Sequence, residues 1–153
     1  MNNPTRGSAT PLPPLKQLMQ DLQTDLREYQ ALHQLLEAQF QAALRHDASA
    51  LQAQAAEVTT LVDRLDQRRQ ARRELLRTLL PVHPAPGVAE LLALLPAQGP
   101  MRANAARGWA QLEALVRACK ERNARNGRLM ADQQAVFQRV LHGEENPLYG
   151  SDF

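Results

Sequence analysis

Few residues of this chain are of the types that catalyse reactions or hold metals. A di-iron site in a helical bundle would need Glu-x-x-His pairs that project inward, yet no histidine here has a glutamate three residues before it. The histidines are His33, His46, His83 and His142. The sequence also lacks a glycine-rich phosphate loop, a Gly-x-Ser-x-Gly elbow and a Cys-x-x-Cys pair. We therefore expect no metal, no cofactor and no enzymatic activity.

The single cysteine, Cys119, lies at an apolar position of a predicted helix. One cysteine cannot form an internal disulfide, and a cysteine on an apolar face usually packs as a small core side chain. That interpretation is favoured over a reactive thiol.

The turns of this helix that follow Cys119 carry residues that can form hydrogen bonds between helices. Asn123 and Asn126 fall in a mostly apolar row whose members recur in steps of four and three. This spacing keeps one face of a long helix against partner helices. The row comprises Ala105, Trp109, Leu112, Val116, Cys119, Asn123, Asn126, Met130, Gln133, Phe137 and Val140.

An asparagine in such a row costs stability, but it can fix the register of two helices because a buried amide must find a hydrogen-bond partner. Gly127 is also unfavourable inside a helix, by roughly 1 kcal/mol relative to alanine. We expect Asn123 and Asn126 to face other helices, either to set the register or to bind a partner. With Gly127 beside them, we also expect a bend in the helix or close approach by another chain.

Long amphipathic helices must position these residues. Apolar residues at helical spacing predict a first helix over about 15–44, and Asp47 is expected to cap the helix that follows. The second helix shows the same four-three spacing until Pro81.

A connector over 81–100 holds five prolines and two glycines around a short helical segment at 88–95. The last long helix is expected to run from about 102 to 141 and to end at Gly143. The predicted fold is all-α, an antiparallel bundle of three long helices with a short fourth helix in the connector.

Length and composition agree with a single helical domain. The chain has 153 residues, few aromatic residues and no β-branched run that alternates with period two. We expect a proline-rich leader at 1–14, one domain at 15–142 and a flexible tail at 143–153. Because there is no signal peptide and the longest apolar segment, 88–95, is too short to span a membrane, we expect a cytoplasmic protein without direct membrane insertion.

The net charge is only +2, but positive charge gathers in the last helix. Nucleic-acid binding is disfavoured there, because acidic residues interrupt the bases and no exposed aromatic residues lie between them. The second helix carries a further basic cluster, Arg68 to Arg73. This cluster is either a basic docking patch or, as we favour, a solvated stretch where the helix extends beyond its partner.

The end of the last helix is apolar over more of its circumference than one helix contact requires. A wide apolar stripe near a chain end has to be buried in the core, by self-association or by a partner. We interpret it as a binding surface in which Met130 adapts to imperfectly matched partners. Its apolar members are Leu129, Met130, Val136, Phe137, Val140 and Leu141.

The same helix carries a signature that precedes a motif in the tail, Asn123-x-x-Asn126-Gly127-x-Leu129 and then Leu148-Tyr149-Gly150. Together with the order of the helices along the whole chain, this combination resembles the FlgN family of flagellar type III export chaperones.

The resemblance implies that the protein binds the hook-filament junction proteins in the cytosol and delivers them to the flagellar export gate. Family members hold the C-terminal helical segment of the client with their own C-terminal helix. Asn123, Asn126, Gly127 and Leu129 match that site. Tyr149 matches the tail tyrosine that contacts the cytoplasmic domain of the export-gate membrane protein.

Two functions from different classes therefore stand. The first is an export chaperone for junction proteins, without a nucleic-acid partner. The alternative is a structural coiled-coil protein or a basic helical protein that binds nucleic acid.

Overall fold

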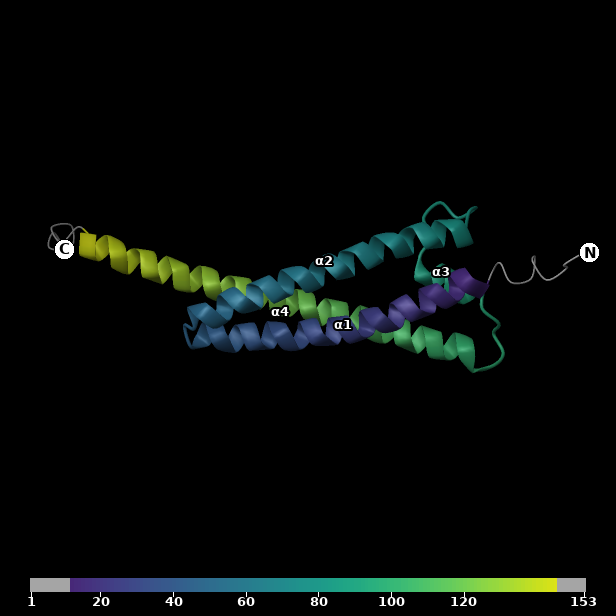
Figure 1. Ribbon diagram of the computed structural model, residues 1–153, viewed down its shortest axis with the longest axis horizontal. Coiled ribbons are helices and arrows are strands. Elements are labelled where there is room, and N and C mark those ends of the chain that lie inside the picture. The colour runs from purple at the N-terminus through teal and green to yellow at the C-terminus, as the bar shows by residue number, and fades with distance from the viewer. Residues whose placement is uncertain (1–11, 146–153) are drawn as a thin grey trace, which may run out of the picture.

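The computed structural model describes the backbone of residues 12–145 and the side chains of residues 14–143. The described chain forms only helices, so the predicted all-α class is confirmed (Figure 1). The four helices are α1 (Leu12–Leu44), α2 (Ala48–Leu79), α3 (Val88–Ala93) and α4 (Pro100–Glu145). None of the described helices is apolar over a long enough stretch to cross a membrane.

The predicted end of the last helix is wrong, because α4 continues through Gly143 to Glu145. A glycine ends a helix when it takes up the left-handed conformation. In the described chain only His46 and Gly99 have a positive φ. Gly143 therefore remains an ordinary helical residue, and α4 is longer than the sequence predicted.

The turn between α1 and α2 is built as expected. His46 takes a left-handed φ of 55°, and the N–H of Asp47 bonds the Ala42 carbonyl across it at 3.0 Å. This pattern closes a helix C-terminus. The Asp47 carboxylate then accepts a hydrogen bond from the N–H of Ala50 at 3.1 Å, so the predicted N-cap of α2 is confirmed.

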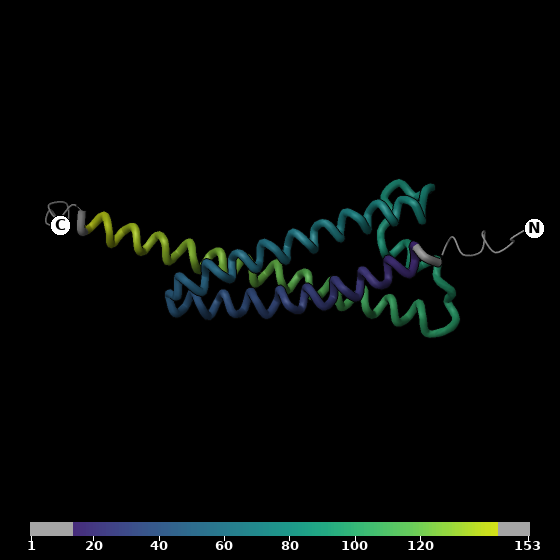
Figure 2. The backbone as a smooth tube through the Cα atoms, in the orientation of Figure 1, coloured from purple at the N-terminus to yellow at the C-terminus, as the bar shows by residue number. Residues whose placement is uncertain are grey.

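Helix α1 packs against both α2 and α4. Ion pairs join α1 to α2 at sequence separations that grow from 36 to 47, which is the pattern of an antiparallel pair. Hydrogen bonds join α1 to α4 at a constant separation of 90, which requires a parallel pair. Helix α1 thus runs antiparallel to α2 and parallel to α4, which are the directions expected where three successive long helices alternate (Figures 1 and 2).

The apolar core lies in two places along α1. One cluster fills the end where α3 packs over the long helices, with Leu18, Leu76 and Leu92 among its buried members. The other lies farther along α1 and joins Leu36 to Leu65 of α2 and Cys119 of α4.

Helix α4 extends past the α1–α2 turn, as the yellow end of the ribbon shows (Figure 1). Its last hydrogen bond to α1 runs from Gln133 Nε2 to the Ala43 carbonyl, at 2.9 Å. We call residues 134–145 the overhang. Every side chain described in it, from 134 to 143, is exposed.

Candidate functional site

Asn126 joins α4 to α1 at a point fully removed from solvent. Its Nδ2 donates to the Leu36 carbonyl at 2.7 Å and to Gln39 Oε1 at 2.9 Å. Its Oδ1 accepts from the Arg125 guanidinium at 3.2 Å. Because Nδ2 reaches both acceptors on α1 in this register only, Asn126 is suited to set the alignment of the parallel pair.

Charged side chains lie between this buried amide and the solvent. Arg125 lies 3.6 Å from the centre of the Phe40 ring and bonds Glu37 at 3.0 Å. Arg122 pairs with the same Glu37 carboxylate. The hydrogen bond from Arg125 and the charge of Arg122 hold the pKa of Glu37 below its ordinary value. These contacts fasten α4 to α1 about two turns before the overhang begins.

The other two signature residues lie outside this contact. Asn123 is exposed, so the expectation that both asparagines face other helices is confirmed for Asn126 and wrong for Asn123. Gly127 is exposed as well, and a Cβ built on it would have no neighbouring atom within 4 Å. No contact in the described chain therefore requires a glycine there, and the space remains open to another chain.

The predicted apolar stripe is partly buried before the overhang and exposed within it. Leu129 and Met130 are half-buried. Val136, Phe137, Val140 and Leu141 are between 38 and 58 % exposed. These four form the apolar part of the overhang, and no described residue covers them.

The overhang meets the α1–α2 turn in a hollow of about 450 Å³. His46 contributes from the turn, and α4 contributes Asp132 and three residues of the stripe, Val136, Phe137 and Val140. The site therefore combines an open apolar helix face with a polar edge. Tyr149, the predicted docking residue, lies outside the described residues.

The arginine cluster of α2 is neither wholly a docking patch nor wholly a solvated stretch, the two interpretations that the sequence allowed. Arg68 and Arg72 turn inward to Asp25 of α1, which is only 1 % exposed; Arg68 Nε lies 3.2 Å from its Oδ1, and Arg72 pairs with its Oδ2. Arg68 also bonds Glu28 at 2.7 Å. Burial raises the pKa of Asp25, and the two guanidinium groups oppose that effect. Half of the cluster thus holds α2 on α1, while Arg69 and Arg73 are exposed.

Cys119 is a core residue. It is 4 % exposed, and its thiol donates to the Tyr29 carbonyl at 3.5 Å. Burial raises the pKa of Cys119 to about 11. The thiol is therefore protonated at neutral pH, as the preferred interpretation of the sequence requires.

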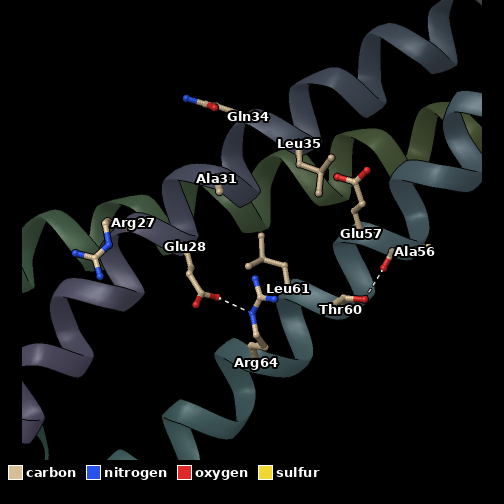
Figure 3. A pocket seen from close by; sticks show the side chains of 10 residues that line it. All are labelled: Arg27, Glu28, Ala31, Gln34, Leu35, Ala56, Glu57, Thr60, Leu61 and Arg64. Carbon is tan, nitrogen blue, oxygen red and sulfur yellow. Dashed lines mark hydrogen bonds and ion pairs between the residues drawn. The ribbon is translucent and has the colours of Figure 1, made fainter.

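A second open surface lies between α1 and α2 (Figure 3). It measures about 730 Å³ and is lined by apolar residues such as Leu35 and Leu61. Positive and negative charges offset each other in this groove, because Glu28 and Arg64 form an ion pair of 3.3 Å across it. This groove offers no preference for the charge of a ligand.

One known family matches the chain. The model of the family described as FlgN protein matches residues 14–152, which include α3 and almost all of the long helices. No curated protein and no solved structure matches the chain.

Proposed function

The chain belongs to the FlgN family of flagellar export chaperones, and we propose that its clients are the hook-filament junction proteins. In this proposal the protein binds their C-terminal helical segments in the cytoplasm and delivers them to the flagellar type III export gate. The family is one of chaperones rather than enzymes, and it binds export substrates.

The observation that carries the proposal is the apolar face of the overhang. Four large apolar side chains occupy a helix end that no described residue covers. An unassembled client segment with one apolar stripe is an aggregation hazard, and a helix face of this kind can cover it. Val136, Phe137, Val140 and Leu141 are therefore the proposed contacts, with Leu129 and Met130 at the root of the overhang.

The size of this face favours reversible binding. Covering a half-exposed valine, leucine or phenylalanine contributes about 1 kcal/mol. Four such side chains supply only part of the free energy of a tight complex. A chaperone that must release its client at the export gate needs such moderate affinity.

The signature residues take different parts in this proposal. Asn126 acts as a positioning residue, because its bonds to Leu36 and Gln39 fix α4 where it leaves the bundle. Asn123 and Gly127 are exposed and can be approached directly by a client.

Cross-linking tests the proposed contact. A photo-reactive phenylalanine analogue in place of Phe137 should cross-link to the C-terminal segment of a junction protein. The matched control is the same analogue at Leu94, which is 68 % exposed and lies at the C-cap of α3, away from the overhang. Equal cross-linking from both positions would contradict a specific site on the overhang.

Tyr149 is proposed to dock on the cytoplasmic domain of the export-gate membrane protein, as part of the segment that follows α4. The support is the Leu148-Tyr149-Gly150 motif of the family. Tyr149→Ala should weaken binding to the gate domain and leave junction-protein binding unchanged. Equal gate binding by the variant and the unaltered protein would remove this assignment.

A further inference from the structure

Helices α2 and α4 both pack on α1 but do not approach each other closely. The space between them is a groove with an apolar floor that includes Tyr29 and Leu32. Val58 and Val62 stand on its α2 side, and Trp109 and Val116 on its α4 side. We call this surface the α2–α4 groove.

The groove is long enough to hold a helix. Two adjoining hollows of about 210 and 280 Å³ share Tyr29 and Val116, and together they reach from Trp109 to Asn123 along α4. That stretch corresponds to roughly 20 Å, or about four helical turns. Val62 is 44 % exposed, so the α2 wall offers apolar surface to a ligand.

Positive charge prevails along the α4 wall. Arg117 and Lys120 line the groove and are exposed, and their side chains make no ion pair or hydrogen bond with any described residue. Glu113 is the one acidic residue that lines the groove on that wall. On the α2 wall, Arg69 is held by Asp66 at 2.6 Å and Arg72 by Asp25. The groove thus differs from the α1–α2 groove of Figure 3, whose charges balance.

We propose that the α2–α4 groove holds a second amphipathic helix of the bound export client, one with acidic flanks. Its apolar face would lie on Tyr29 and Val62, and its acidic flank would lie along Arg117 and Lys120. The helix would occupy the fourth position beside three long helices, where helices pack through apolar faces. The inference rests on the proposed chaperone function but uses a different surface from the overhang.

Trp109 gives a direct readout, because it is the only tryptophan of the chain and lines the groove. The probes are two synthetic helical peptides of about 15 residues, or roughly 22 Å, with the same leucine stripe and flanks of either glutamate or lysine. The acidic peptide should shift the Trp109 emission and saturate, with an affinity roughly tenfold above that of the basic peptide. Equal affinity for the two peptides would overturn the proposal.

The variant Arg117→Glu/Lys120→Glu should lose the preference for the acidic peptide. The matched control, Arg27→Glu/Arg107→Glu, makes the same change in charge at exposed positions outside the groove and should keep the preference. Loss of the preference in the control alone would overturn the assignment. Both variants alter exposed side chains, and a circular-dichroism melt verifies that they fold.

Two further measurements separate this inference from the proposed function. Phe137→Ser/Val140→Ser should leave the Trp109 response to the acidic peptide unchanged, even though it weakens client binding to the overhang. An intact junction protein added to the unaltered chaperone should displace the acidic peptide. Failure to displace it, with client binding to the overhang intact, would overturn the groove assignment alone.

Discussion

At the scale of single residues, Asn126 shows how one amide can align two long helices. The four-three spacing predicted its place against a partner, because that spacing follows a helix contact from turn to turn. The same row predicted that Asn123 faces another helix, and this prediction is wrong. Asn123 lines the open α2–α4 groove, where α2 does not pack against α4. A row of residues shows which face is inward but not where the partner helix diverges.

Asn126→Ala should lower the free energy of unfolding by about 1–3 kcal/mol, because it removes two hydrogen bonds in a buried site and leaves the Gln39 Oε1 without its donor. Asn123→Ala is the matched control on the same helix and should change it by less than about 0.5 kcal/mol. Urea unfolding followed by circular dichroism measures both. Similar values for the two variants would show that Asn126 does not set the contact.

Cys119 should react slowly with a thiol reagent such as Ellman's reagent at pH 8, and rapidly after unfolding in urea. The thiol is buried, and its pKa of about 11 in the folded state leaves little thiolate at that pH. Since the folded pKa lies above the ordinary value of 9.0, the stability that the protonated thiol contributes is present below pH 9 and is lost as the pH rises towards 11. Rapid reaction in the folded state would indicate an accessible thiol.

At the scale of the elements, charged residues inside α1 and α2 hold the two helices together beside their apolar contacts. Asp25 falls in the apolar row of α1, and Arg72 falls in the corresponding row of α2. A carboxylate in one row and guanidinium groups in the other were the signal that could have predicted the pairing. The sequence could not show which of the arginines would meet Asp25, because that depends on the register of the two helices.

Arg72→Ala should destabilise the protein by about 2 kcal/mol or more, since it removes one partner of a carboxylate that is 1 % exposed while Arg68 remains. Arg73→Ala, one residue away and exposed, should have an effect within about 0.5 kcal/mol. Thermal and urea unfolding of both variants measure the difference. A neutral Arg72→Ala would mean that the pair contributes nothing to holding α2 on α1.

At the scale of the whole molecule, α4 extends beyond the end of α1 and presents an apolar face that no described residue covers. The helical class, the caps around Asp47 and the wide apolar stripe followed from spacing and residue type. The point where α1 ends beneath α4 depends on how the connector returns the chain, which no local residue spacing indicates. The apolar stripe therefore predicted a surface that packs against something. In the structure, the exposed part of this stripe begins at Val136.

The overhang is proposed to bind the junction-protein segment, and isothermal titration calorimetry tests this binding most directly. Phe137→Ser/Val140→Ser should weaken binding of the junction protein's C-terminal segment by roughly 30-fold, because two half-exposed apolar contacts of about 1 kcal/mol each are lost. The control variant Val82→Ser/Leu94→Ser removes two apolar side chains that are more exposed and lie outside the overhang, and it should bind as the unaltered protein does. Undiminished affinity in a folded Phe137→Ser/Val140→Ser variant would contradict the account.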